Sequence, residues 1–115
     1  MRRLILAGLA LALAATPALA ADGAKLFALQ CKTCHGPAST VAGPTLKGVS
    51  GRKIASAPGF TYSAGLKAKT GTWTDANLDA FLAAPAKFAP GTKMLSGVPN
   101  AENRAALAGY MKTLK

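Results

Sequence analysis

The stretch Cys31-Lys32-Thr33-Cys34-His35 holds both cysteines and the single histidine of this 115-residue chain. Two thiols three residues apart at a helix end, followed at once by an imidazole, can make three bonds to one flat ligand. Each thiol can add to one vinyl group of a haem, and the imidazole can then bind the iron, which is why this spacing is a signature of c-type haem attachment. The motif therefore predicts one covalently bound haem c, fixed by five consecutive residues.

Other functions of a Cys-x-x-Cys pair fit the sequence less well. A thioredoxin-like redox pair needs a βαβ pattern, which is absent here. A zinc site of cysteine and histidine ligands needs four of them, and the chain has only Cys31, Cys34 and His35. A plain disulfide is compatible with an exported protein, although it would leave the histidine without a role.

The first twenty residues have the pattern of a secretory signal peptide. Arg2 and Arg3 precede an apolar run over residues 4–13, and the segment ends in Ala18-Leu19-Ala20. We therefore expect a signal peptide over 1–20, cleaved after Ala20, and a single domain over 21–115 in the periplasm. A retained membrane anchor or a buried helix is the alternative, but the apolar run is too short to span a bilayer.

The chain is strongly basic, with 14 Lys and Arg against 4 Asp and Glu and a formal net charge of +10. Such a charge suits acidic partners, either nucleic acid or proteins. No recognition element for nucleic acid is visible, so we expect no nucleic-acid partner. The lysines are scattered along the sequence, which fits either a solvated basic surface or steering towards acidic docking faces of redox proteins.

The periodicity predicts an all-α domain with three or four short helices and long loops. Thr74 and Asn100 are predicted N-caps, and Pro85 is expected to end the third helix. Long loops in a compact domain need something that holds them in place, and a small domain has little apolar core of its own. A central haem would hold the loops in place and would also add to the apolar core. The expected helices span residues 22–32, 63–69, 75–84 and 101–114.

His35 is the only histidine of the chain. A second protein ligand to the iron must therefore be a residue of another type. Met111 lies on the apolar stripe of the last helix, where core packing is the better interpretation. Met94 ends the loop Pro90-Gly91-Thr92-Lys93-Met94 and is the better candidate, with an open or lysine-bound iron as the alternatives. Two protein ligands would leave no place for a substrate, which favours electron transfer over catalysis.

Five further stretches resemble class I cytochrome c, in particular the group of mitochondrial cytochrome c and bacterial cytochrome c2. The similarity covers almost all of the chain after residue 20. The stretches are Gly43-Pro44-Thr45-Leu46, Gly51-Arg52-Lys53, Ala57-Pro58-Gly59-Phe60-Thr61-Tyr62-Ser63, Thr72-Trp73 and Pro90-Gly91-Thr92-Lys93-Met94.

The resemblance implies a role for each matching residue. It implies a small class I cytochrome c fold in which the first and last helices cross at Gly23, and places Lys32, Lys87 and Lys93 near the haem edge. The implied site has thioethers from Cys31 and Cys34, axial ligands from His35 and Met94, a carbonyl of Pro44 on the His35 ring, and Arg52, Tyr62 and Trp73 at the haem propionates.

The resemblance also implies a function, that of a monomeric carrier of single electrons. It would shuttle between redox complexes, from a bc1-type donor to an oxidase or reaction centre, touching membrane complexes only transiently and converting no small-molecule substrate. Two alternatives remain. One is a dedicated electron acceptor of an exported dehydrogenase, and the other is a haem protein that binds or senses small ligands through a labile Met94.

Overall fold

The computed structural model describes residues 21–115 and, among the first twenty, only Gly8. The predicted signal peptide over 1–20 therefore lies outside the described residues. Within the described part, no helix is both long and apolar enough to cross a membrane. That part holds five helices and no strand: α1 (Gly23–Gln30), α2 (Ala64–Lys67), α3 (Asp75–Ala83), α4 (Pro85–Phe88) and α5 (Ala101–Met111).

The helices begin where side chains can satisfy their first free backbone N–H groups. Thr74 caps α3 and Asn100 caps α5, as predicted, each accepting a hydrogen bond from the backbone N–H three residues on. Asp22 and Ser63 cap α1 and α2 in the same way. These interactions are local, which is why the sequence pattern located the helix starts.

The helix count differs from the prediction because of Pro85. This residue was expected only to end the third helix, but it also begins the single turn α4 as its first residue. Proline is well suited to that position, since its fixed φ is helical and the N–H that it lacks would have had no partner there. The first and last helices are also shorter than expected and end at Gln30 and Met111.

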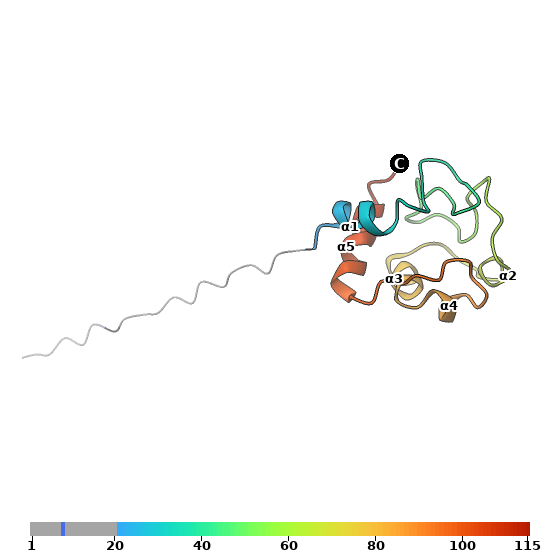
Figure 1. The fold of residues 1–115 in the computed structure, drawn as a ribbon. Helices are drawn as coiled ribbons and strands as arrows, with labels where there is room; N and C mark the ends of the chain where they lie inside the picture. Colours follow the sequence, from blue (N-terminus) through green and yellow to red (C-terminus); the bar gives the residue numbers. More distant parts are fainter. Residues whose placement is uncertain (1–7, 9–20) are drawn as a thin grey trace, which may run out of the picture.

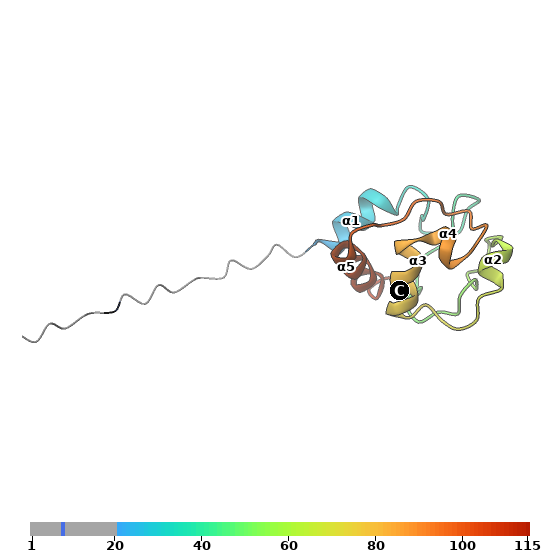
Figure 2. The same ribbon diagram turned by 90° about the horizontal axis from the view of Figure 1, so that it is seen from below.

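Helix α1 crosses α5 in direct contact with it, and α5 also packs against α3 (Figures 1 and 2). Gly23 makes the crossing close, because a Cβ at this position would lie 2.3 Å from the carbonyl oxygen of Ala106. The rings of Phe27 and Tyr110 meet there with centroids 5.1 Å apart. Leu107 of α5 is fully buried and belongs with Phe27 to the apolar core, which therefore includes the crossing.

At the other end of the molecule, α2 lies away from this crossing in both views, among long irregular segments (Figures 1 and 2). An aromatic cluster joins these segments to α3 and α4, with Trp73 lying 5.3 Å from Phe81 and 5.8 Å from Phe88 between ring centroids. The N–H of Gly51 donates to Trp73 O, and the N–H of Trp73 donates to Arg52 O. These two backbone hydrogen bonds hold the loop around residues 51–52 in place. The loops are therefore fixed to the helices by a few long-range contacts rather than by a sheet.

Candidate functional site

The two cysteines and the histidine lie on one turn that continues from α1. Cys31 caps the helix through its N–H to Phe27 O (2.9 Å), and the N–H of His35 returns to Cys31 O (2.9 Å). Cys31 is buried and Cys34 is exposed, and both are free thiols. The turn therefore presents two separate sulfur atoms and an imidazole, and the structure gives no support for the disulfide alternative.

Burial affects the chemistry of the inner thiol. Desolvation raises the pKa of the Cys31 thiol above its ordinary value. At neutral pH this cysteine is therefore held as the neutral thiol, which is consistent with a packed side chain rather than a reactive thiolate. As a thioether the same sulfur would have no ionised form for burial to disfavour.

The imidazole of His35 has a fixed tautomer. Its Nδ1 lies 2.9 Å from the carbonyl oxygen of Pro44, and because a carbonyl only accepts, Nδ1 must carry the proton. The lone pair then resides on Nε2, which is the arrangement found in metal-binding histidines. Gly43 permits this contact, since a Cβ there would lie 2.7 Å from Cys34 O and 3.1 Å from the ring.

Arg52 is hydrogen-bonded to the loop that contains Pro44. Its guanidinium donates to Lys47 O (2.8 Å) and to Thr45 O (3.1 Å), next to Pro44. Its Nε is buried and has no hydrogen-bond partner among the described residues. A buried N–H without an acceptor is costly, so this atom is where an anionic group such as a haem propionate would be accommodated.

Tyr62 and Trp73 are the other two residues predicted at the propionates. The hydroxyl oxygen of Tyr62 accepts the N–H of Ala57 (3.0 Å), which leaves its own proton free to donate. Trp73 is buried in the aromatic cluster, with only 7% of its surface exposed. Both therefore have structural roles, and their roles at the cofactor remain predictions.

Met94 lies half-buried on the segment that joins α4 to α5 and packs against the core cluster. Its N–H is bonded to the Thr92 hydroxyl (3.3 Å), and Thr92 is itself buried. Met111, in contrast, is a core residue with 3% of its surface exposed, as its place on the apolar stripe predicted. Of the two methionines among the described residues, Met94 is thus the less buried one, and its role as an iron ligand remains a prediction.

Sequence reasoning missed two contacts that position the Met94 segment, although it had placed Lys93 itself near the haem edge. A Cβ on Gly65 of α2 would lie 2.1 Å from Pro90 O, so this helix sits directly on the start of the segment. Lys93 donates to Thr61 O (2.9 Å), across 32 residues of sequence. Neither contact has a local signal, although glycine inside a short helix is a hint of close approach.

The residues present fit a covalently attached haem. The site offers two free thiols, an imidazole whose Nδ1 donates to Pro44 O, and a buried guanidinium nitrogen without a hydrogen-bond partner. Among residues 21–115 no three His, Cys, Asp or Glu side chains gather to hold a metal ion by themselves. Short helices around such a thiol–thiol–imidazole turn define a small c-type haem protein.

Comparison with known proteins agrees with this class. The family model described as Cytochrome c matches residues 20–115. The chain is 40% identical to "Cytochrome c" of Ulva intestinalis over 85% of its own length and 92% of that protein. It is 41% identical to "Cytochrome c2" of Rhodoblastus acidophilus over 81% and 90% of the two chains. The solved structure of "cytochrome cH from Methylobacterium extorquens" superposes with a TM-score of 0.72 at 41% identity, covering 81% of this chain and 99% of that one.

This chain belongs to the cytochrome c family. The predicted class I resemblance and the all-α fold class are confirmed. Membership implies a covalently bound haem c and the role of a mono-haem electron carrier.

Proposed function

We propose that the protein is exported to the periplasm, holds its haem iron between His35 and Met94, and passes single electrons between redox proteins without converting a substrate. The observation that carries this proposal is the hydrogen bond between His35 Nδ1 and Pro44 O (2.9 Å), on the same turn as two free thiols. That bond leaves Nε2 as the only ring atom able to bind a metal. When bound, the haem supplies reversible one-electron exchange at its iron.

The other residues of the site would hold and orient this group. Cys31 and Cys34 would anchor one edge of the ring by thioethers, one from the buried side and one from the exposed side of the turn. Arg52 Nε–H would donate to a propionate, which would satisfy the one buried polar side-chain atom left without a partner in the described residues. Tyr62 and Trp73 would donate from the neighbouring loops. A thioether from Met94 would fill the remaining iron position and keep out small molecules.

Spectroscopy of the purified protein tests this proposal. Produced in a host with cytochrome-maturation machinery, it should be coloured, and its pyridine complex should have the spectrum of a haem with two thioethers. The oxidised form should show the far-red absorption band of methionine bound to ferric iron, and the reduced form should not bind carbon monoxide readily at neutral pH. The variant Cys34→Ala should shift the pyridine spectrum to that of a haem with one thioether.

Two results would contradict the proposal. Colourless protein from such a host would exclude haem attachment. Ready binding of carbon monoxide by the reduced protein, without the far-red band, would favour the ligand-binding alternative over the carrier. Intact mass of the same material would test cleavage after Ala20.

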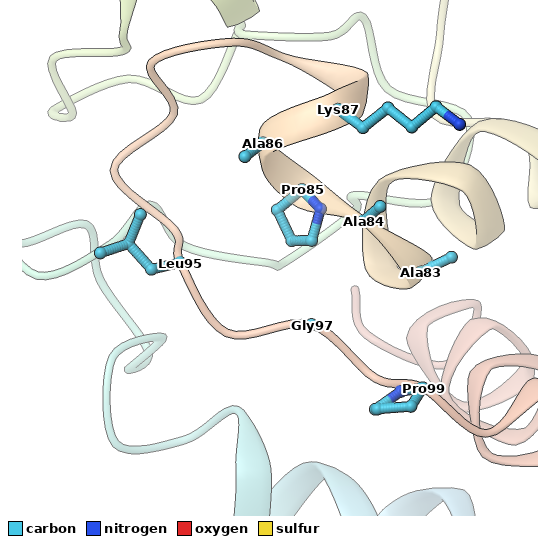
Figure 3. Close-up of a pocket in the computed structure, with 8 residues that line it drawn as sticks. All are labelled: Ala83, Ala84, Pro85, Ala86, Lys87, Leu95, Gly97 and Pro99. Atoms are coloured by element: carbon cyan, nitrogen blue, oxygen red, sulfur yellow. The ribbon is translucent and has the colours of Figure 1, made fainter.

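A groove beside the Met94 segment is the docking face that we propose for a redox partner. It measures about 460 Å³ and is mostly apolar, and Figure 3 shows α4 on one side of it and the segment over residues 95–99 on the other. Leu95, the residue after Met94, is 83% exposed. Lys87 supplies the only charge and no acidic residue contributes, so the groove suits a protein with an apolar contact inside an acidic rim. The lining residues are Ala83, Ala84, Pro85, Ala86, Lys87, Leu95, Gly97 and Pro99.

Charge reversal at Lys87 should slow association with such a partner. We expect Lys87→Glu to lower the second-order rate of electron transfer to a bc1-type complex or oxidase roughly three- to tenfold at low salt, because steering by charge acts mainly on association. The matched control is Lys25→Glu on α1, which changes the net charge equally but lies away from α4 (Figure 1). Equal slowing by both variants would show that net charge, rather than this face, sets the rate.

A further inference from the structure

A turn between Arg52 and Tyr62 contains a strained residue. Ala55 has a φ of +59°, and among the described residues it is the only one other than glycine with a positive φ. A residue with a Cβ is disfavoured in this left-handed region, which glycine enters freely. Neighbouring contacts must therefore hold Ala55 in this conformation, and strain that is held in this way is typical of functional positions.

The hydroxyl of Ser56 closes this turn. It donates to the carbonyl oxygen of Lys53, three residues earlier in the chain. No backbone N–H of the described residues donates to that oxygen, so the side chain supplies the bond that a backbone amide often makes in a four-residue turn. Ala55 is the third residue of the turn, where a positive φ normally calls for glycine. Ser56 therefore clamps the strained residue in place.

The residues on either side of Ala55 are fixed to other parts of the chain. Before it, Ile54 is buried and its N–H bonds to Gly71 O (3.1 Å). After it, Ala57 is buried and its N–H bonds to the hydroxyl oxygen of Tyr62 (3.0 Å). The conformation of Ala55 therefore sets the position of the Ala57 N–H relative to the fixed Ile54.

The same turn connects the residues proposed to hold the haem propionates. Arg52 directly precedes it, and the carbonyl of Arg52 accepts the N–H of Trp73 (2.8 Å). Tyr62 is bonded to its far end through Ala57, and the ring of Tyr62 meets the Phe60 ring edge-on with centroids 4.9 Å apart. Because the Tyr62 oxygen already accepts the Ala57 N–H, its own proton is left to donate elsewhere, in a direction that this bond restricts.

We infer that Ser56 is a positioning residue for the haem: its clamp on the strained turn keeps the Ala57 N–H on Tyr62 and so directs the tyrosine proton towards a propionate. The hydroxyl of Ser56 is itself bonded to Lys53 O, so it acts on the cofactor only through Tyr62. The inference rests on the proposed placement of a propionate beside Tyr62. It goes beyond that proposal because it assigns the residues that orient the donor.

The equilibrium of electron exchange between the holoprotein and a mediator of known potential measures this role. A hydrogen bond to a propionate offsets part of its negative charge, so losing the bond favours ferric over ferrous iron. Tyr62→Phe should shift the equilibrium constant towards the oxidised protein roughly two- to fivefold, and Ser56→Ala should shift it the same way by about 1.5- to twofold.

Two variants serve as controls for Ser56→Ala. Ser56→Thr keeps a hydroxyl that can donate to Lys53 O and should restore the wild-type equilibrium. Ser50→Ala removes a serine hydroxyl a few residues earlier that makes no hydrogen bond among the described residues, and it should leave the equilibrium unchanged. A shift in Ser50→Ala equal to that in Ser56→Ala would overturn the assignment to Ser56.

A double-mutant cycle tests whether Ser56 acts through Tyr62. If it does, Ser56→Ala should cause no further shift of the equilibrium in the Tyr62→Phe background, and a full additional shift would overturn the positioning role. In Ser56→Ala alone, the amide of Ala57 should lose protection from hydrogen exchange, while that of Ile54, bonded to Gly71 O, should keep it. Equal loss at both amides would show a general loosening of the loop and would also overturn the role.

The variant Ala55→Gly tests the clamp on the strained residue. Glycine adopts a positive φ without strain, so the turn should then depend less on the Ser56 hydroxyl. We expect Ser56→Ala to lower Tm by about 2–5 °C in the wild-type background and by less than half as much in the Ala55→Gly background. The same decrease in both backgrounds would overturn the clamp.

The same measurements separate this inference from the proposed function. An unchanged electron-exchange equilibrium in Tyr62→Phe would overturn the proposed placement of a propionate beside Tyr62, and the positioning role of Ser56 with it. A shift in Tyr62→Phe, together with a Ser56→Ala variant that behaves as the wild type, would overturn the positioning role alone.

Discussion

Replacing Met94 with leucine is expected to turn the carrier into a haem protein that binds carbon monoxide without a gating step. Leucine is close to methionine in volume and apolar, so it should keep the contacts of this half-buried side chain with the core. It has no sulfur to give to the iron. The place of Met94 would therefore be filled by a side chain that packs but cannot bind the iron.

The size of the effect follows from the population of the open state. In the wild type only the fraction of molecules with Met94 displaced can bind the gas, and minor conformers of this kind are typically about 0.1–10% populated. Removing the competition should raise the apparent affinity roughly ten- to a thousandfold. The reduction potential should fall, because ligation by methionine and histidine raises it in cytochromes c.

Gas titration of the reduced protein and a potentiometric titration measure these two changes. Met111→Leu is the matched control, because the same substitution in the buried core of α5 should leave both quantities near their wild-type values. If Met94→Leu bound carbon monoxide no better than the wild type, Met94 would not be the ligand. The lysine-bound alternative would then have to be considered.

Local features of the fold could be predicted from the sequence. The caps Thr74 and Asn100 were located because a hydroxyl or amide side chain and the backbone N–H three residues on are close in sequence. The turn over residues 31–35 was located because its two cysteines and its histidine lie within five consecutive residues. The first helix was expected to reach Lys32, but it ends at Gln30 because Cys31 already caps it and begins the turn.

Contacts between distant segments could not be predicted from patterns. The predicted end of the last helix near Leu114 is wrong by one turn: α5 ends at Met111, and the carbonyl of Leu114 accepts the N–H of Gly48 (2.7 Å), a loop residue far away in sequence. Two hydrogen bonds beside Met94, from Lys93 to Thr61 O and from Arg104 to Val98 O, also join parts of the chain that no local pattern connects. The family resemblance supplied the pairing of Pro44 with His35, which spacing alone would not have given.

A methyl group added at Gly23 should destabilise the whole domain. Its Cβ would lie 2.3 Å from Ala106 O, 2.9 Å from Ala106 C and 3.0 Å from Tyr110 Cβ, and none of these atoms is the end of a flexible side chain. To relieve the clash, α1 and α5 would have to separate, which would loosen the Phe27–Tyr110 contact and expose part of the core. Overpacking of this kind costs about 1–3 kcal/mol, and more where backbone must move.

The matched control lies on α5 itself, where a Cβ on Gly109 would meet nothing within 4 Å. Gly109→Ala should stabilise the protein by about 0.5–1 kcal/mol, since alanine is the better helix residue. For a domain of this size Gly23→Ala should lower Tm by roughly 5–20 °C, and Gly109→Ala should raise it by a few degrees. Thermal unfolding followed by far-UV circular dichroism measures both changes. An unchanged Tm for Gly23→Ala would show that the two helices do not need this close approach. The turn that carries Cys31 would then be positioned by something other than the crossing, because α1 connects the two.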